Sequence, residues 1–510
     1  MTTNPAIVFI GFMGAGKSWS LSSVEGSDGQ AHDIDDLIEQ HVGMSVREFF
    51  DSRDEAEFRQ IEETVALLLL DKADGGAIAL GGGTVLSSKV RDVLARHTVV
   101  WLDVSPDAAW ERVAESDRPL AQDRRRFDRL FEERKPIYEA LADVVLPEGD
   151  PGLVVRALPS IRAMSELPDD TKMLWAVSAS GEYPVFVGNE LLKSDWWPIT
   201  GRRFCITDTT VGALYADRVE PLTALIEIPP GEPSKDVEEL LPVLNALGDA
   251  GMIREDHVVA LGGGVVGDLA GFCAHIYQRG VPIVHVPTSL VAQVDSAYGG
   301  KTGVDSEWGK NYFGAYHLPA AVLADTTTLV SLSREELTAG FVEVIKTALL
   351  AGGELWEQVR LIESLDPGGL KDIVFTCARY KCSIVAADER DSGLREVLNL
   401  GHTVGHALEV ASGYSRYRHG EAIGLGLLAA LRLSNANALR DEVEEILMRH
   451  GLPVVLKGVD TNVALEAIQH DKKRTGDGVG FVLLSEPGKP RTGQVLDPDT
   501  VKAAVMELHG

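Results

Sequence analysis

The chain has 510 residues, too many for one ordinary hydrophobic core, so two or three domains are expected. An apolar content of 45%, a charged content of 25% and 51 glycines are typical of an α/β protein and exclude a disordered or fibrous chain. The formal net charge of −29 argues against binding to nucleic acid or to an acidic membrane, because both require a basic face.

The location expected is the cytoplasm. The four cysteines, Cys205, Cys273, Cys377 and Cys382, form no C-x-x-C pair, which favours a reducing compartment. The apolar start "AIVFIGFMGAG" lacks a basic leader and is interpreted as a first strand. No uninterrupted apolar run approaches the ~20 residues of a membrane span, so no membrane partner is expected.

Hydrophobic patterning predicts three units. Residues 1–160 alternate short apolar runs with charged helical stretches, which predicts a parallel α/β domain. The polar stretch of residues 158–173 contains two prolines, and the expected linker within it is residues 161–173. A second α/β series occupies residues 174–330, and helical periodicity dominates residues 331–510.

A phosphate-binding loop follows the first predicted strand. Gly11 to Ser18 fits G-x-x-x-x-G-K-[ST]. In such a loop the backbone N–H groups of Gly14, Ala15 and Gly16 cradle phosphates, Lys17 reaches the β and γ groups, and Ser18 ligates Mg²⁺. The motif therefore predicts a MgATP site.

Charged residues further along this domain extend the prediction. Asp33 and Asp35 follow the second predicted strand, where one carboxylate could support magnesium and the other accept a hydroxyl proton. Three arginines (Arg59, Arg118 and Arg134) and the "LGGGT" turn are individually typical of a surface or a tight turn. Together they are not easily explained as surface residues alone.

In the order of these motifs, residues 5 to about 155 resemble shikimate kinase. The resemblance implies that Asp35 is the base and a shikimate ligand, and that Asp33 faces the magnesium. The resemblance assigns binding of the substrate carboxylate to Arg59, Arg134, Gly82 and Gly83. Arg118 matches a lid arginine over ATP, and Arg112 is expected near adenine. The implied reaction transfers the γ-phosphoryl of MgATP to the 3-hydroxyl of shikimate.

One stretch departs from that family. "WSLSSVEGSDG" carries four serines and two glycines where a helix is usual, and "QAH" stands where an apolar strand is usual. Ser costs roughly 0.5 kcal/mol and Gly about 1 kcal/mol relative to a good helix former, so the stretch loses ~4 kcal/mol of helix propensity. Residues 19–32 are therefore expected to lack a regular helix.

A glycine turn marks the second unit. "VVALGGGVVGDLAGF" is a strand, a glycine-rich turn and the start of a helix, an arrangement that brings backbone close to a pyrophosphate. Lys235, Lys301 and Lys310 place positive charge around neighbouring glycine turns of a strongly acidic chain. This combination predicts a dinucleotide site.

A metal site is predicted in the third unit. "NLGHTVGHALE" places His402 and His406 four residues apart on one helical face, "RHGEA" offers His419, and "AGFVEVIK" offers Glu343. Three such ligands with an open fourth position suit a catalytic zinc. Spacing leaves open which of the two helical histidines binds metal and which handles a proton.

These motifs resemble 3-dehydroquinate synthase across residues 175 to about 500. The resemblance implies a Rossmann-like NAD domain followed by a helical domain whose zinc or cobalt is held by Glu343, His402 and His419. It leaves Asp295, Lys346, Lys381 and His406 for catalysis. The implied substrate contacts are Arg279, Lys301, Asn311, Arg395, Asn399 and Lys472. The implied NAD contacts are Asp208, Pro230, Gly231, Glu232, Pro233, Ser234, Lys235, Gly264, Val265, Val266, Gly267, Asp268, Thr288, Ser289, Lys301, Lys310, Thr328, Leu329, Val330 and Ser331.

The chemistry implied starts from the seven-carbon sugar-acid phosphate DAHP. Hydride passes to NAD, phosphate is eliminated, the hydride returns, and an aldol step closes the ring. Two departures from the family are mild: Ser289 replaces a usual Thr, and Tyr298 replaces a smaller residue and either crowds the phosphate pocket or points away.

The hypothesis is thus a bifunctional enzyme that acts on DAHP, shikimate and ATP and forms a homodimer through its synthase half. Two alternatives stay open at this stage. The first is an active synthase with a degenerate kinase module, and the second is a cyclase with a different substrate.

Overall fold

The computed structural model describes residues 4–24, 30–114, 123–150, 152–475 and 479–509, with backbone only for residues 470–475. The chain divides into two compact units, described separately below. The first comprises Met1–Ala176, Pro184–Phe186 and Ser194–Pro198, and the second comprises Val177–Tyr183, Val187–Lys193 and Ile199–Gly510.

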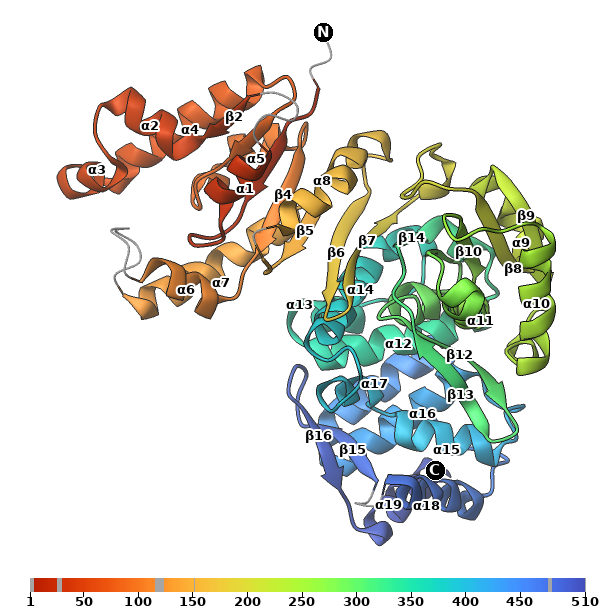
Figure 1. Cartoon of the computed structure of the whole chain (residues 1–510). Helices are drawn as coiled ribbons and strands as arrows, with labels where there is room; N and C mark the ends of the chain where they lie inside the picture. Colours follow the sequence, from red (N-terminus) through yellow and green to blue (C-terminus); the bar gives the residue numbers. More distant parts are fainter. Residues whose placement is uncertain (1–3, 25–29, 115–122, 151, 476–478, 510) are drawn as a thin grey trace. The chain divides into compact units, whose positions relative to one another are not determined.

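The first unit is built on a parallel sheet (Figure 1) whose strands follow the order β2-β3-β1-β4-β5-β6. Its strands are β1 (Ile7–Ile10), β2 (Ala31–Asp33), β3 (Ala77–Ala79), β4 (Thr98–Asp103), β5 (Val144–Pro147) and β6 (Lys172–Ser178). Its helices are α1 (Lys17–Val24), α2 (Ile34–Val42), α3 (Val46–Ser52), α4 (Glu55–Lys72), α5 (Ser88–Leu94), α6 (Pro106–Val113), α7 (Arg124–Leu141) and α8 (Leu153–Ala163). Because the strands are parallel, the segments after β1, β2 and β3 emerge at one edge, where ligands of such sheets bind.

The expectation that residues 19–32 lack a helix is wrong for the part that the structure describes. Helix α1 runs from Lys17 to Val24, and Ala31–Asp33 pair with β3 as strand β2. Leu21 and Val24 are buried, so packing offsets the poor propensity. The serine hydroxyls donate to carbonyl oxygens of the preceding turn, Ser20 to Gly16 and Ser23 to Trp19, which satisfies them within the helix. Residues 25–29 lie outside the described part.

The predicted linker, residues 161–173, contains the end of α8, the 3-10 turn η3 (Met164–Glu166) and the start of β6. Ile161 and Leu167 within it are buried. The domain boundaries drawn from the sequence remain predictions.

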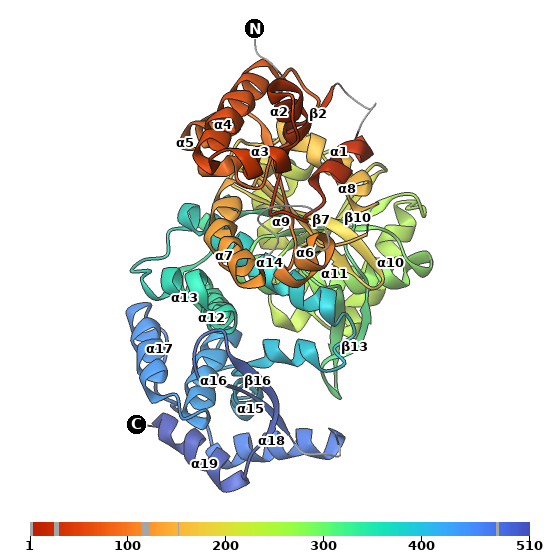
Figure 2. The ribbon, with the colours of Figure 1, turned by 90° about the vertical axis from the view of Figure 1, so that its left-hand side faces the viewer.

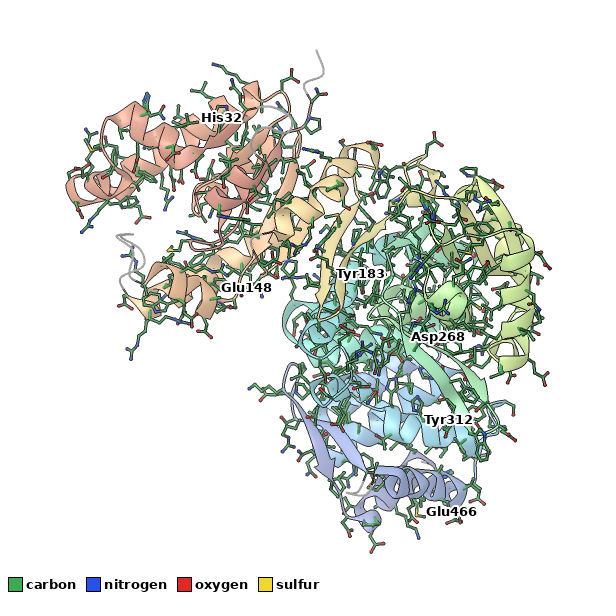
Figure 3. The ribbon with its side chains drawn as sticks, viewed as in Figure 1. His32, Glu148, Tyr183, Asp268, Tyr312 and Glu466 are labelled. Atoms are coloured by element: carbon green, nitrogen blue, oxygen red, sulfur yellow. The ribbon has the colours of Figure 1, made fainter. Side chains whose placement is uncertain are left out.

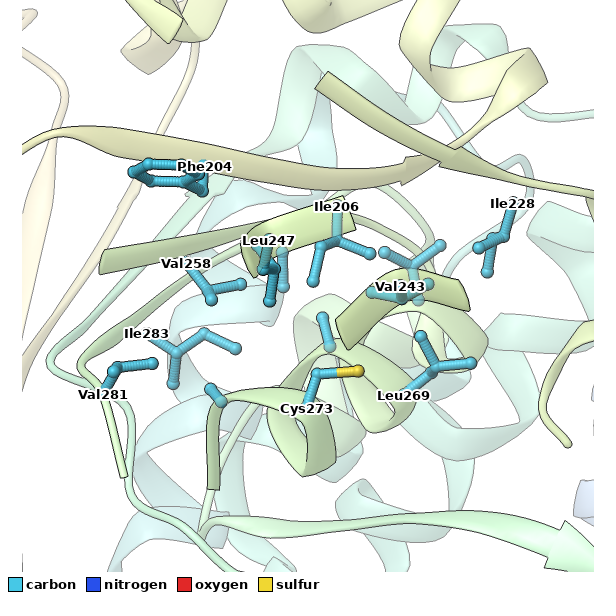
Figure 4. Packing of buried hydrophobic residues seen from close by; sticks show 14 of the residues in the cluster. Phe204, Ile206, Ile228, Val243, Leu247, Val258, Leu269, Cys273, Val281 and Ile283 are labelled. Carbon is cyan, nitrogen blue, oxygen red and sulfur yellow. The ribbon is translucent and has the colours of Figure 1, made fainter. Parts of the chain in front are cut away.

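The second unit contains parallel strands in the order β14-β11-β10-β8-β9. Its strands are β8 (Arg203–Asp208), β9 (Leu222–Ile228), β10 (His257–Gly262), β11 (Ile283–Pro287) and β14 (Ala321–Asp325); β7 (Gly181–Gly188) precedes them. Helices α9 (Thr209–Tyr215), α10 (Val237–Asp249) and α11 (Gly264–Ile276) connect the strands. Apolar side chains of α10 and α11, including Leu247, Leu269 and Cys273, pack on Phe204 and Val258 in the core of this region (Figure 4).

The chain moves from β8 to β9 on one side and returns to β10 on the other. The ends of β8 and β10 are therefore a topological switch point, where nucleotides bind in open α/β sheets. A hairpin of β12 (Lys301–Ser306) and β13 (Gly309–Tyr316) follows. Tyr312 marks this hairpin in Figure 3.

The rest of the second unit is mostly helical. Its elements are α12 (Arg334–Ala351), α13 (Gly353–Arg360), α14 (Lys371–Ala387), α15 (His402–Ala411), α16 (His419–Leu433), α17 (Asn437–Arg449), α18 (Thr461–Thr475), β15 (Gly480–Leu484), β16 (Pro490–Val495) and α19 (Pro498–Met506). Figure 2 shows α15, α16, α18 and α19 grouped with the β15–β16 hairpin. The predicted fold class, a P-loop domain followed by a Rossmann-like domain and a helical region, is confirmed. Among the described residues, no helix combines the length and apolar composition needed to span a bilayer.

Candidate active sites

A cavity of about 320 Å³ lies at the strand edge of the first unit. It is lined by Met13, Asp35, Glu39, Ser45, Val46, Arg47, Phe50, Phe58, Arg59, Glu62, Gly81, Gly82, Gly83 and Arg134. The structure thus brings together Asp35, the two arginines predicted to bind the substrate carboxylate and the glycine turn, which the sequence separates by up to about a hundred residues. Carboxylates and guanidinium groups in one hollow suit a small polyhydroxylated acid.

Arg59 is held in this cavity by two acids. Its Nη1 atom lies 2.5 Å from Oε2 of Glu62, and its Nη2 atom lies 3.3 Å from Oε1 of Glu55. Glu62 is buried and also accepts a hydrogen bond of 2.7 Å from the hydroxyl of Thr84. A Cβ on Gly83 would lie 2.2 Å from Nη1 of Arg59, so glycine is required for this approach. The sequence analysis missed Glu62; its spacing of three residues from Arg59 was the available signal.

The remaining predicted substrate residues are fixed from other elements. Arg134 of α7 is buried and donates to the carbonyl oxygen of Gly82 at 3.2 Å, and the hydroxyl of Tyr138 donates to the same oxygen at 2.5 Å. Asp33 ends β2 and caps α2, since its Oδ1 atom accepts from the backbone N–H of Asp35 at 3.0 Å. This cap places Asp35 in the first turn of α2.

A second hollow of about 350 Å³ lies beside the phosphate loop. It is lined by Ala15, Gly16, Trp19, Ser20, Leu102, Asp103, Val104, Arg112, Leu146, Pro147, Glu148, Gly149, Asp150, Leu153 and Val154. Arg112 donates to the carbonyl oxygen of Gly14 at 3.1 Å and to Glu148 at 2.8 Å (Figure 3 labels Glu148). The hollow has the size and the position for the rest of a nucleotide whose phosphates enter the loop.

The loop itself has the backbone that phosphate binding requires. Gly14 and Gly16 have φ angles of 84° and 93°, which favour glycine. Lys17 lies along the loop, with its Nζ atom 2.9 Å from the carbonyl oxygen of Gly11 and 3.1 Å from that of Phe12. Ser18 follows in the first turn of α1. The lid residue Arg118 lies outside the described residues.

In the second unit, the predicted nucleotide residues surround the switch point. Helix α11 starts directly after β10, and its N-cap residue Gly263 makes no side-chain cap hydrogen bond, an arrangement that suits an anion at the first turn. Close contacts leave little room for side chains in the turn, because a Cβ on Gly262 would lie 2.6 Å from the side chain of Val266. Asp208 caps α9 beside it, and its Oδ1 atom accepts from the N–H groups of Thr210 and Val211 at 2.9 Å.

A buried ion pair reinforces this turn. Nζ of Lys235, which follows the exposed 230–233 loop, lies 2.5 Å from Oδ2 of Asp268 on α11. Asp268 is labelled in Figure 3. Burial raises the pKa of Asp268 even though Lys235 lies beside it. In the 328–331 segment, Thr328 and Leu329 are buried, whereas the side chain of Val330 is 70% exposed.

The histidine cluster lies between α12, α15 and α16. One ring nitrogen from each of His402, His406 and His419 lies within 4.8 Å of the other two. Oε1 of Glu343 lies 3.6 Å from Nε2 of His402 and 3.4 Å from Nε2 of His419. Gly420 allows this approach, since a Cβ there would lie 1.9 Å from the carbonyl oxygen of Ala339 on α12. Four candidate ligands thus converge from three helices.

The donor set fits a cation. Glu343 is fully buried; its Oε2 atom faces Lys346, and its Oε1 atom faces the two histidines. Burial would raise the pKa of Glu343, but the positive charge of Lys346 beside it lowers that pKa well below its usual value, so Glu343 is an anion. Burial, with Lys346 nearby, lowers the pKa of His402 to about 3, so its ring is neutral and able to ligate.

A buried charge network adjoins the cluster. Nζ of Lys346 lies 2.5 Å from Oε2 of Glu343 and 3.4 Å from Oδ2 of Asp295. Lys381 of α14 donates to the Asp295 carboxylate and, at 2.6 Å, to its carbonyl oxygen. Burial opposes ionisation of Asp295, but the two lysines lower its pKa to about 2. Burial lowers the pKa of Lys381 despite its contact with Asp295, as suits a lysine that exchanges a proton.

A second glutamate, which the sequence analysis missed, faces the histidines from α15. Oε1 of Glu409 lies 3.5 Å from Nδ1 of His419 and 3.5 Å from Nζ of Lys310. Burial would lower the pKa of His419, but the carboxylates of Glu343 and Glu409 raise it to about 9. The two carboxylates therefore favour a cation at this ring, either a proton or a metal. The i,i+3 spacing from His406 was the signal in the sequence.

Several predicted substrate residues are exposed or paired with a residue outside this cluster. Arg279 is exposed at the far end of α11, a helix of 13 residues or about 20 Å. Lys301 pairs with Asp391, Asn399 is exposed, and Asn311 is exposed on β13 with a φ of 52°. The side chain of Lys472 lies outside the described part.

Two other predicted positions have clear roles in packing. Arg395 is buried and donates to the carbonyl oxygen of Glu389 at 2.9 Å. Tyr298, the unusual aromatic residue, is fully buried and donates to the carbonyl oxygen of Gln293 at 2.6 Å, so it points into the core. Ser289 lies against the glycine turn, with its Oγ atom 3.2 Å from the Cβ position of Gly263.

Comparison with known proteins gives three family matches. The shikimate kinase profile matches residues 13–154, and the 3-dehydroquinate synthase N-terminal and C-terminal profiles match residues 225–339 and 340–474. The 3-dehydroquinate synthase of Symbiobacterium thermophilum is 39% identical over 351 residues, which cover 64% of this chain and 98% of that protein.

Solved structures show the same fold in the second unit. A 2-deoxy-scyllo-inosose synthase complexed with carbaglucose-6-phosphate, NAD⁺ and Co²⁺ has a TM-score of 0.60 and 25% identity, covering 66% of this chain and 100% of its own. The 2-epi-5-epi-valiolone synthase ValA from Streptomyces hygroscopicus, with NAD⁺ and Zn²⁺ bound, has a TM-score of 0.57 and 25% identity, covering 66% and 99%. The chain belongs to the 3-dehydroquinate synthase family and carries a shikimate kinase family domain ahead of it, as its motifs predicted.

Proposed function

We propose that this chain catalyses two reactions of the shikimate pathway, the conversion of DAHP to 3-dehydroquinate with phosphate release and the ATP-dependent phosphorylation of shikimate. The observation that carries the proposal is that each unit collects its own reactive groups. Asp35, Arg59 and Arg134 line one cavity of the first unit, and Glu343, His402 and His419 converge in the second.

For the synthase half, the proposed ligands of a divalent zinc or cobalt ion are Glu343, His402 and His419. Both histidines turn Nε2 toward the same carboxylate oxygen of Glu343. The His406 side chain is 58% exposed, which supports a role in substrate binding and proton transfer. Bound NAD and the divalent metal would supply reversible hydride transfer and polarisation of a carbonyl group.

The remaining groups of the synthase site supply charge and proton transfer. Lys346 and Lys381 flank Asp295 and would stabilise the anionic substrate as phosphate leaves. The glycine turn before α11, with Lys235 and Asp268, is the proposed binding site of the NAD pyrophosphate. The two related cyclases of known structure are less similar in sequence than the synthase relative, 25% against 39% identity, which favours DAHP as the substrate.

For the kinase half, Asp35 would accept the proton of the shikimate 3-hydroxyl while Arg59 and Arg134 hold the carboxylate. Lys17 would move from its carbonyl contacts to the transferring phosphoryl group, with Mg²⁺ on Ser18 and near Asp33. The alternative, a degenerate kinase module, rested on the poor helix propensity of residues 19–32. Formation of α1 and β2 weakens that alternative.

Assembly and location are also proposed. Arg279 lies about a helix length from the glycine turn of its own chain, which supports a homodimer through the synthase half in which the arginine serves the other copy. All four cysteines are buried as free thiols, which supports a cytoplasmic setting.

The synthase proposal is tested by removing metal from the purified chain with a chelator, dialysing, and restoring Zn²⁺ or Co²⁺. Phosphate release from DAHP should fall on chelation and return with the metal. The kinase proposal is tested by ADP release that depends on shikimate. Absence of that release, with synthase activity present, would establish the degenerate-kinase alternative.

A further inference from the structure

Glu409 is the one acidic side chain of α15 that is buried among the histidines. Only 3% of the residue is exposed, so its charge is shielded from water and must be matched by neighbours. Its Oε1 atom lies 3.5 Å from Nδ1 of His419, and its Oε2 atom lies 4.0 Å from Nε2 of His406. Lys310 of the β12–β13 hairpin supplies a matching positive charge, with Nζ 3.5 Å from Oε1.

The ring of His419 is placed between two carboxylates. Its Nε2 atom lies 3.4 Å from Glu343, whereas its Nδ1 atom faces Glu409. His402 has the same arrangement with a different partner, since its Nδ1 atom lies 3.2 Å from the carbonyl oxygen of Leu400 and its Nε2 atom faces Glu343. Both rings therefore have an acceptor at Nδ1 and present Nε2 to one point.

A neutral imidazole carries a proton on one nitrogen and a lone pair on the other. An acceptor at Nδ1 keeps the proton there and leaves the Nε2 lone pair for a metal. A carboxylate in that position also increases the basicity of the ring. For His402 the acceptor is the backbone carbonyl of Leu400, which a side-chain substitution does not remove. For His419 the acceptor is the side chain of Glu409, which a substitution does remove.

We propose that Glu409 is the positioning residue that orients His419 and fixes its tautomer for binding of the divalent metal. The inference rests on the proposed metal site at Glu343, His402 and His419. Glu409 acts from behind the ring: Nδ1 and Nε2 point in different directions, so the carboxylate at Nδ1 does not share the cation held at Nε2. Its second contact, with Lys310, holds the carboxylate in place.

The test uses the full-length chain, freed of metal, and Co²⁺ alone as the probe. Affinity is measured by competition with a chromogenic chelator, and the coordination geometry by the visible absorption of bound Co²⁺. The variants are Glu409→Leu, which removes the acceptor, and Glu409→Gln, which keeps a neutral acceptor of the same size. Glu445→Gln on α17, an exposed glutamate of the same unit, is the matched control.

Glu409→Leu should weaken Co²⁺ binding by about 10-fold to 100-fold and change the absorption spectrum. Glu409→Gln should lie between Glu409→Leu and the wild type, weaker than the wild type by at least about threefold, because a charged acceptor binds the ring N–H roughly twice as strongly as a neutral one. Glu445→Gln should match the wild type. A merely structural role of Glu409 would lower the unfolding temperature without changing the spectrum of the folded fraction.

Wild-type affinity and spectrum in Glu409→Gln would overturn the inference, and this variant decides the question even if Glu409→Leu does not fold. If the wild-type chain itself binds no Co²⁺, the proposed metal site fails instead. The two failures are therefore distinguishable.

Discussion

Nε2 of His402 lies 3.6 Å from Oε1 of Glu343, and this contact joins α15 to α12 at the centre of the second unit. Glu343 lies on a helix that is buried along most of its length, and its second oxygen, Oε2, pairs with Nζ of Lys346 at 2.5 Å. A buried carboxylate that faces a neutral imidazole strongly favours binding of a cation. This pair therefore anchors the interpretation of the synthase half.

His402→Ala should reduce synthase activity by at least about 100-fold, since a metal acting as a Lewis acid contributes several kcal/mol and ~2.7 kcal/mol corresponds to that factor. Kinase activity should be unchanged, because all the proposed kinase residues lie in the first unit. Both activities are measured on one preparation of folded variant. Parallel loss of the two would contradict independent sites.

Asp35→Asn should lower the kcat for shikimate phosphorylation by about 10² to 10⁴, the contribution of a general base. Asp36→Asn offers a matched control, since Asp36 is the next residue of α2 but is exposed. It should keep activity within about twofold while synthase turnover stays unchanged in both variants. Equal effects of the two substitutions would show that Asp35 acts only through charge or helix stability.

Gly83→Ala should displace Arg59, because the new Cβ would lie 2.2 Å from its guanidinium nitrogen. The expected result is a higher KM for shikimate, by about tenfold if one charged hydrogen bond of ~1.5 kcal/mol is lost. Gly82→Ala is the comparison, since a Cβ there has its nearest neighbour at 3.4 Å. Should Gly82→Ala raise KM more than Gly83→Ala, the proposed role of Arg59 is wrong.

The second unit should lose stability in mild acid. Burial lowers the pKa of His257 and of His285 from 6.5 to about 4, with Arg203 and His317 respectively adding to the effect. Their neutral forms stabilise the fold above pH 6.5, and this stability is lost as the pH falls toward 4, because the unfolded chain takes up the protons first. At pH 5 the loss is on the order of 1–2 kcal/mol per histidine.

Urea unfolding of the second unit at pH 7.5 and pH 5.0 measures this loss. His285→Gln should make the free energy of unfolding less dependent on pH, whatever its effect on absolute stability. Replacement of the exposed His41 in the first unit by Gln is the control and should leave the pH dependence unchanged. An equally steep pH dependence in His285→Gln would contradict the assignment.

Much of both sites could be predicted from local sequence. The phosphate loop and the H-x-x-x-H pair have fixed spacings, because the groups of each motif lie on one short stretch of backbone. The order of the motifs identified both families. The helix over residues 17–24 could not be predicted, since its stability comes from burial of Leu21 and Val24 and from serine hydroxyls bonded to carbonyl groups, and propensity includes neither.

Contacts between distant elements account for the other differences. The proposed role of Glu409 depends on the meeting of α15 with α16 and on the approach of Lys310 to Glu409. The contact of Glu62 with Thr84 depends on the approach of the glycine turn to α4. Arg279 shows the reverse case: it is close in sequence to the nucleotide turn, but a helix carries it about 20 Å away.

A two-substrate assay on the intact wild-type chain tests the central claim most directly. One preparation is given DAHP with NAD and Zn²⁺, and separately shikimate with MgATP. We predict 3-dehydroquinate and phosphate from the first reaction and shikimate 3-phosphate and ADP from the second. Synthase turnover without any shikimate-dependent ADP would contradict the claim that both units are catalytic.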